Sequence, residues 1–286
     1  MVSGVVSTEN NTMKFFLLSF FFAGLFMPCS AQKQWDLRLQ AGYDFSTASQ
    51  YLLNHAMVTS LSSVTRAVNS SFGRGPSFSA DVTRWVNNWF GFTAGGRYHI
   101  TGPAVKGYYD YNAVDYRYNA TSSWHSHTAI AMAGIALKVP DTKLHPYARM
   151  GVLLPIYAGI TENADWSSFG LTGSSHGQYK KVFRVRNTAG YTASAGIAPK
   201  LGKHMSVFAE INLQSLAILA RRSELISYKQ NDAEKIDTYP VYARKTDYVK
   251  KLDEYRTYSA DEPSQELTFS FPYSSIGIHI GVSFKL

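Results

Sequence analysis

Apolar and polar residues alternate with a period of two along much of the chain, which predicts strands with two different faces. The alternation is clearest at the end of the sequence. There one face carries Ile276, Ile278, Ile280, Val282, Phe284 and Leu286, and the other carries small or polar residues. Similar stretches cover 35–45, 77–83, 90–100, 128–139, 147–157, 188–198 and 207–213. The pattern predicts eight strands, although 128–139 is too uniformly apolar for its two faces to be assigned.

The connectors between these strands alternate in length. Those at 87–88, 140–145 and 199–204 are short and contain Asn, Pro or Gly, which favour turns. Those at about 46–75, 101–124, 159–181 and 220–265 each hold roughly 20 residues or more, whereas connections in compact soluble domains average about 4 to 6 residues. Tight periplasmic turns and long extracellular loops are typical of outer-membrane barrels.

The sequence therefore predicts an all-β fold, a closed antiparallel transmembrane β-barrel of eight strands. Six of the eight predicted strands have 11 or 12 residues, which is enough for the roughly 9 to 11 that a tilted strand needs to cross a bilayer. The strands must close because an open sheet edge is not tolerated in lipid, and an eight-stranded ring has room inside only for side chains. Alternating stretches such as Lys235–Tyr242 would give ten strands if they added a hairpin. A soluble lipocalin-like barrel is the alternative fold.

The start of the chain predicts a secretory signal peptide over residues 1–31. Lys14 precedes the apolar run Phe15–Met27, and small residues stand at 29–31. The first twelve residues contain Glu9 and no basic residue, which favours Met13 as the true start. Cleavage would leave 32–286 as the barrel and would remove Cys29, the only cysteine, so that disulfides and thiolate sites are excluded from the mature chain.

Composition agrees with membrane strands, since 45% of the residues are hydrophobic, 14% are aromatic and only 17% are charged. The net charge of +8 favours acidic partners such as the phosphates of lipopolysaccharide. The connector 220–265 contains nine basic and nine acidic residues that are interspersed. This mixture indicates a solvated segment and predicts no nucleic-acid partner.

Two segments carry a resemblance to a known family. The terminal strand GIHIGVSFKL resembles the signal that the barrel-assembly machinery reads, and AGIAPKLGKHMSVFAEINLQSL is similar to the sixth and seventh strands of the small outer-membrane β-barrel superfamily. That superfamily includes the membrane domain of outer membrane protein A and its X-type and W-type relatives. The resemblance implies a monomer in the outer membrane of a Gram-negative bacterium, with Phe284 and Leu286 in the assembly signal. The chain departs from the family in ending on Leu286 rather than on an aromatic residue.

Charged residues on the polar faces of the predicted strands are candidates for the lumen. They are Asp36, Arg38, Asp44, Asp81, Arg97, Arg149, Glu210 and Lys285. They would line an ion path or pair with one another, and we expect pairing because an unpaired buried charge costs several kcal/mol. Glu210, between Ala209 and Ile211, is the best candidate for an ion-pair partner.

The segment 108–118 is the part of the chain richest in tyrosine. Its tyrosines are Tyr108, Tyr109, Tyr111, Tyr116 and Tyr118. Because Tyr supplies a rigid, amphipathic contact surface, the segment predicts a loop that binds a protein or a glycan. The alternative is an aromatic girdle at the membrane surface.

A catalytic or metal site is weakly indicated by His125, Ser126 and His127 alone. No third catalytic member is apparent, and two histidines do not make a metal site without further ligands. We therefore predict no enzyme, no metal and no cofactor. The expected role is structural or adhesive, through extracellular loops that bind a surface or a partner. A narrow, porin-like channel for small or hydrophobic solutes ranks second, and a lipid-modifying enzyme ranks third.

Overall fold

The computed structural model describes residues 34–47, 51–59, 62–69, 71–101, 105–113, 115–140, 142–171, 173–186, 188–252 and 259–286. The predicted signal peptide, residues 1–31 with Met13, lies outside the described residues. Within the described ranges, no helix has both the length and the apolar character that a membrane crossing requires.

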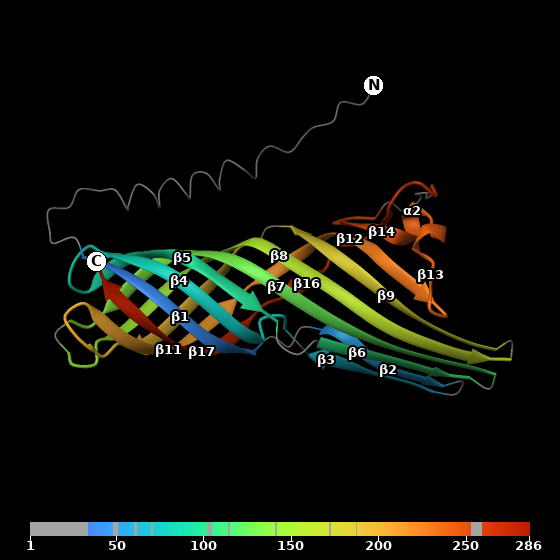
Figure 1. The fold of residues 1–286 in the computed structure, drawn as a ribbon, viewed down its shortest axis with the longest axis horizontal. Coiled ribbons are helices and arrows are strands. Elements are labelled where there is room, and N and C mark those ends of the chain that lie inside the picture. Colours follow the sequence, from blue (N-terminus) through green and yellow to red (C-terminus); the bar gives the residue numbers. More distant parts are fainter. Residues whose placement is uncertain are drawn as a thin grey trace, which may run out of the picture.

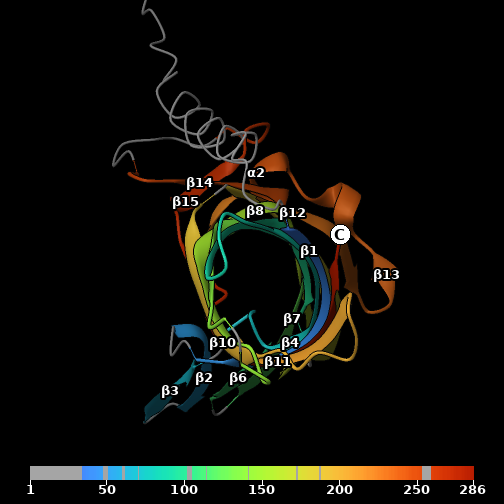
Figure 2. The same cartoon turned by 90° about the vertical axis from the view of Figure 1, so that its left-hand side faces the viewer.

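Eight strands close into an antiparallel ring, which Figure 2 shows nearly end-on. Each strand is hydrogen-bonded to the next, and the last pairs back to the first. In ring order they are β1 (Gln34–Ser46), β4 (Gly75–Trp85), β5 (Phe90–Ile100), β7 (Tyr116–Lys138), β8 (Pro146–Gly170), β10 (Gly190–Ile197), β11 (Met205–Ser215) and β17 (Ser275–Lys285). The predicted eight-stranded barrel is confirmed.

The alternative of a ten-stranded ring is not what the structure shows. The stretch 235–242 contains the 3-10 helix η1 (Ile236–Thr238) and the start of the short helix α2 (Val241–Arg244), and it adds no strand to the ring. Pro240 precedes α2, and a proline has no backbone N–H to donate to a neighbouring strand.

Side chains alternate between the two sides of the ring, as the pattern predicts. On β1, Arg38, Gln40 and Asp44 are buried inside, whereas Leu39 and Phe45 are exposed outside. The structure also assigns the faces of 128–139. Its inner face carries Thr128, Ile130, Met132, Gly134 and Ala136, and most of these residues are apolar. That apolar inner face is why the sequence there shows no alternation.

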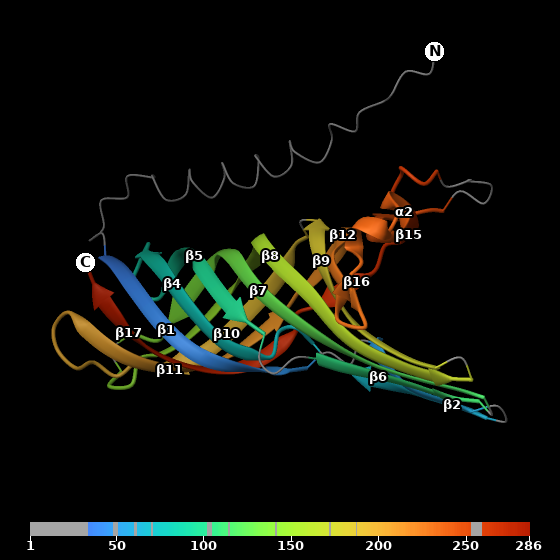
Figure 3. The same cartoon turned by 45° about the vertical axis from the view of Figure 1, so that its right-hand side comes forward.

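The long connectors form a sheet rather than irregular loops. β7 and β8 continue for 23 and 25 residues and pair with each other along this length, so both run past the ring. Their extra length offers edges on which β6 (Val105–Asn112) and β9 (Gly173–Arg186) pair, followed by β2 (Tyr51–Thr59), β3 (Ser63–Asn69) and β12 (Ala217–Gln230). We call this sheet the extension, and Figures 1 and 3 show it projecting from one end of the ring.

Shorter strands complete the extension and join it to the ring. β13 (Ala233–Glu234), β14 (Lys245–Val249) and β16 (Ser270–Pro272) each pair with β12, and β15 (Ser264–Leu267) lies parallel to β14. Among the described residues, the opposite end of the ring carries short turns and the last residue, Leu286. In one of these turns the Asn87 side chain accepts hydrogen bonds from the backbone of Trp89 and Phe90.

Candidate functional site

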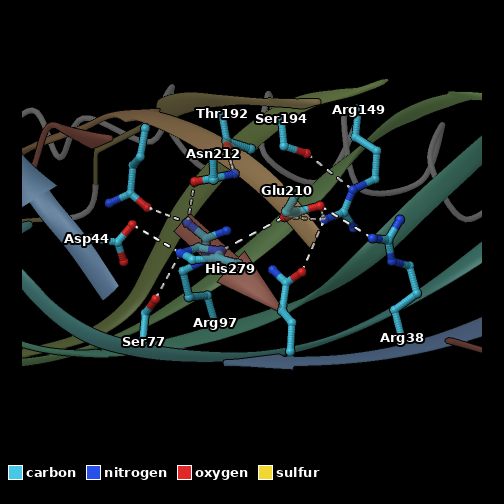
Figure 4. A network of polar contacts seen from close by, with 12 residues as sticks. Arg38, Asp44, Ser77, Arg97, Arg149, Thr192, Ser194, Glu210, Asn212 and His279 are labelled. Atoms are coloured by element: carbon cyan, nitrogen blue, oxygen red, sulfur yellow. Dashed lines mark hydrogen bonds and ion pairs between the residues drawn. The ribbon is translucent and has the colours of Figure 1, made fainter. Parts of the chain in front are cut away.

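A buried ion-pair network crosses the middle of the lumen. The Nη1 and Nη2 atoms of Arg149 donate to Asp81 Oδ1 and Glu210 Oε2, each at 2.7 Å. Arg38 Nη2 lies 3.3 Å from the same Glu210 oxygen (Figure 4). The Tyr147 hydroxyl donates to that oxygen at 2.9 Å. Two guanidinium groups and two carboxylates therefore balance one another. We call Arg38, Asp81, Arg149 and Glu210 the lumen network.

The other predicted lumen charges lie elsewhere inside the ring. Arg97 donates to the side-chain oxygens of Asn212 at 2.8 Å and Gln214 at 3.2 Å, so its hydrogen-bond partners are amides rather than carboxylates. Asp36 accepts a hydrogen bond from the indole of Trp85 at 2.7 Å. Lys285 lines a cavity at the short-turn end.

Two histidines that the sequence reasoning missed lie near the extension end of the lumen. His279 Nε2 is 3.2 Å from Asp44 Oδ1 and 3.3 Å from Ser77 Oγ (Figure 4). His99 Nε2 is 3.9 Å from the other oxygen of Asp44. Both histidines occupy polar-face positions of the same period-two pattern, so that pattern was the signal that could have found them.

The Ser77–His279–Asp44 group does not have the arrangement of a catalytic triad. In a triad the histidine uses one nitrogen for the nucleophile and the other for the acid, but here Nε2 faces both Ser77 and Asp44. His279 Nδ1 lies 3.9 Å from Glu210 Oε1, which is beyond hydrogen-bond distance. Ser77 is also buried within the lumen, where a lipid substrate has no access. The predicted His125-Ser126-His127 group is divided between two faces, because Ser126 points inward to Tyr273 and both histidines point outward.

Aromatic side chains close the lumen where the extension begins. The centroid of Phe72 lies 5.5 Å from that of Phe271 and 5.6 Å from that of Tyr273, and the centroids of Trp124 and Phe183 are 5.0 Å apart. The Phe72 backbone N–H donates to Pro272 O at 2.8 Å, which fixes the segment across the opening. All five rings are buried. We call Phe72, Trp124, Phe183, Phe271 and Tyr273 the aromatic plug.

The predicted tyrosine loop is a hairpin of the extension, made by β6 and the start of β7. Tyr108, Tyr109 and Tyr116 are exposed, whereas Tyr111 and Tyr118 are half-buried. Tyr111 contacts Tyr116, and Tyr109 contacts Tyr118, with centroids 6.2 and 6.0 Å apart.

This aromatic row continues across the extension. Tyr118 is followed by Trp166 on β8 and then by Tyr228 on β12, with centroid distances of 6.2 and 6.5 Å. The three rings lie nearly parallel. The hairpin tyrosines are thus part of an aromatic surface that spans several strands.

A buried carboxylate lies on the same face of the extension. Glu162 on β8 is 8% exposed and accepts a hydrogen bond from the Tyr179 hydroxyl at 3.1 Å. Burial raises the pKa of Glu162 above its ordinary value of 4.5, although Lys181 and the Tyr179 hydrogen bond oppose this effect. The extension therefore contains a carboxyl group that binds a proton at a higher pH than an ordinary glutamate does.

The outer surface of the ring is apolar and ends in aromatic residues. Ile156, Ile211, Ile278 and Ile280 are all more than half exposed. Exposed tyrosines, including Tyr98, Tyr157 and Tyr191, lie on strand segments next to the extension, and Trp89 lies at the short-turn end. A soluble protein rarely exposes so continuous an apolar surface, whereas a membrane barrel requires one with aromatic girdles at both interfaces.

The predicted assembly residues lie at the C-terminal end of the last ring strand, β17. Phe284 on β17 pairs with Leu37 of β1 and Met205 of β11, so it closes the barrel on both sides. Leu286 is exposed, and its backbone N–H donates to Trp35 O at 2.8 Å.

No protein-family model matches the chain, and no curated protein sequence is significantly similar to it. Three solved structures align with 89% of the chain. They are outer membrane protein OprG from Pseudomonas aeruginosa (9% identity, 96% of that chain, TM-score 0.40), the attachment invasion locus protein Ail of Yersinia pestis (9%, 99%, 0.29) and outer membrane protein AlkL (8%, 90%, 0.34).

At these identities and TM-scores, the three structures do not indicate what this chain does. Its own geometry is informative, because a closed ring of eight antiparallel strands has short turns at one end, a long extension at the other and an apolar exterior. The architecture of this chain is that of a small outer-membrane β-barrel.

Proposed function

We propose that the protein is an integral, monomeric protein of the outer membrane of a Gram-negative bacterium, and that it presents the extension to the cell exterior as a binding surface. The apolar exterior, the aromatic girdles and strands of about eleven residues support the membrane location. The short-turn end then faces the periplasm. Lipid and lipopolysaccharide surround the ring, and the barrel-assembly machinery reads Phe284 and Leu286.

The observation that carries the binding role is the continuity of β7 and β8. These strands run from the ring into the extension with one register shift, between Ala129 and Ile130. Tyr116 and Tyr118 lie on β7 in the extension, and Tyr109 lies on β6, which pairs with β7 there. Tyrosine contact surfaces on a rigid sheet lose little conformational entropy on binding. A protein or glycan at a host or neighbouring cell surface is the proposed partner.

The lumen network and the aromatic plug support a closed barrel and therefore disfavour the narrow channel. Charged groups that satisfy one another at the middle of an eight-stranded ring leave little space for solutes. A lipid-modifying enzyme ranks third. Among the described residues, the Ser77–His279–Asp44 group is buried in the lumen and does not have the orientation of a catalytic triad.

The test compares adhesion of bacteria that display the wild-type chain with adhesion of bacteria that display Tyr109→Ser, Tyr116→Ser and Tyr118→Ser together. We expect the triple variant to lose at least tenfold in binding to host cells or to an immobilised surface glycan. Tyr242→Ser is the matched control, since Tyr242 is an exposed tyrosine of α2, away from the hairpin. Heat-modifiable gel migration verifies that each barrel is folded. Equal adhesion by the triple variant and the wild type would refute the proposal.

A further inference from the structure

A cavity of about 210 Å³ occupies the short-turn end of the lumen. Its charged lining residues are Asp36, Arg38, Lys138, Lys200 and Lys285. They come from β1, the end of β7, the turn after β10 and the end of β17, so closure of the ring brings them together.

The lining side chains carry an excess of positive charge. Arg38 belongs to the lumen network, which is neutral as a whole. Asp36 is already bound by the Trp85 indole, and Lys138 Nζ lies 3.7 Å from the centroid of the same ring. Lys200 and Lys285 both act on Lys138 by electrostatic repulsion. Three lysines against Asp36 leave an excess of two positive charges.

Among the described residues, no carboxylate lies within 4.0 Å of any of these three lysine ammonium groups. Like charges held together in a partly desolvated space repel one another, and a bound anion relieves that repulsion. The cavity is also polar elsewhere, because Thr83, Ser206 and Ser283 place hydroxyl groups on its wall.

The cavity is large enough for a small hydrated anion. One water molecule needs about 10 to 15 Å³ of cavity volume, so this cavity is many times larger than a single water requires. A phosphate group carries about −1.5 to −2 charges at pH 7, which matches the excess of two positive charges. Lysine ammonium groups and hydroxyl donors are suited to its oxygens.

We propose that this cavity is a binding site for a phosphate group, held by Lys138, Lys200 and Lys285. The group is carried by free phosphate, by a soluble phosphomonoester or by the headgroup of a lipid in the adjacent leaflet. The site lies at the end of the ring opposite the extension and does not depend on surface binding there.

The experiment measures binding of inorganic phosphate by calorimetry, with the full-length mature chain in micelles of an uncharged maltoside detergent. We expect saturable binding that weakens as salt is added. The double variant Lys138→Gln, Lys285→Gln should bind at least tenfold more weakly. Lys200→Gln, on an exposed turn, should weaken binding about threefold and provides a second variant if the double variant does not fold.

The matched control is Lys203→Gln, on the same turn as Lys200 but outside the cavity lining. It should bind phosphate as the wild type does. The absence of saturable binding, wild-type affinity in both the double variant and Lys200→Gln, or an equal loss in Lys203→Gln would overturn the proposal.

A competition experiment distinguishes the possible sources. Short-chain phosphatidic acid and glycerol 3-phosphate are each added to protein loaded with phosphate. Stronger displacement by the lipid assigns the site to a headgroup, and stronger displacement by glycerol 3-phosphate assigns it to a soluble phosphomonoester. Failure of both to displace phosphate assigns the site to free phosphate.

Discussion

Glu210 is the residue at which the charges of the lumen meet. It contacts Arg149 at 2.7 Å and Arg38 at 3.3 Å, and its side chain is buried. Removal of one partner of a buried ion pair leaves a charge without compensation, which typically costs about 3 to 5 kcal/mol. The stability of the ring should therefore depend strongly on this carboxylate.

We expect Glu210→Gln to lower the free energy of unfolding by about 3 kcal/mol, because Arg38 would then lose its ion pair and Arg149 would keep Asp81 alone. Urea unfolding in detergent micelles measures the change. Glu266→Gln is the control, since Glu266 is exposed on β15 and should have little effect. A Glu210→Gln barrel as stable as the control would show that the network contributes nothing.

Glu162 should make the stability of the extension depend on pH. Its folded-state pKa is raised above 4.5, so the folded state binds a proton more tightly than the unfolded state does. Stability should increase as the pH falls from neutral through that raised pKa, and the gain should be complete below 4.5. Glu162→Gln should stabilise the extension at pH 7 and remove this dependence.

The fluorescence of Trp124, which pairs with Glu162 across β7 and β8, reports the unfolding of the extension at each pH when the other four tryptophans are replaced by Phe. Lys181 and Tyr179 act on the same carboxylate and remain unchanged in the variant. If Glu162→Gln retained the wild-type pH dependence, another group would be responsible.

Much of the lumen was predictable residue by residue, because period-two alternation places Arg38, Arg149 and Glu210 on inner faces. Pairing among these charges was predicted, but which residues pair was not predictable. The choice of partners depends on closure of the ring, which brings together strands that are far apart in the sequence, such as β4 and β8 for Asp81 and Arg149. The same limit applies to His279 and Asp44, whose proximity follows from closure of the ring.

At the scale of elements, the extension was the part of the fold that the sequence pattern did not predict. On β8 beyond residue 158, the buried face carries Ile160, Glu162 and Ala164, and the other face carries Thr161 and Asn163. A charged residue within the apolar face weakens the period-two pattern. Pairing with the edges of β7 and β8 orders these segments, and that pairing is a tertiary effect.

Gly177 provides a test of this element. It lies opposite Trp166, and a Cβ atom there would lie 2.6 Å from the indole Cζ2 and 2.4 Å from Lys229 O. We expect Gly177→Ala to separate β9 from its neighbours and to increase protease cleavage of the extension severalfold. The barrel should keep its heat-modifiable migration, because the ring does not contain β9.

Gly202→Ala is the control for this substitution, since a Cβ at Gly202 would meet no atom within 4 Å. Its protease sensitivity should equal that of the wild type. If Gly177→Ala unfolded the ring as well, the extension and the ring would form one cooperative unit.

At the scale of the whole molecule, the centre of the lumen is closed to both aqueous phases. The lumen network and the aromatic plug lie in series between the short-turn end and the extension. We expect purified protein in planar bilayers to show no large, stable conductance. A general-diffusion porin, recorded under the same conditions, confirms that the bilayers report open pores. Sustained conductance from the folded protein would contradict a closed barrel.

The uninterrupted length of β8 also determines how far the molecule reaches from the bilayer. About thirteen residues follow the outward-facing Tyr157, and at roughly 3.3 Å per residue they extend about 40 Å. Sugar chains of the outer leaflet that are longer than this height would cover the tip, whereas shorter ones would leave it accessible. The length of the surface polysaccharide on a given strain would then determine whether the tyrosine hairpin meets anything at all.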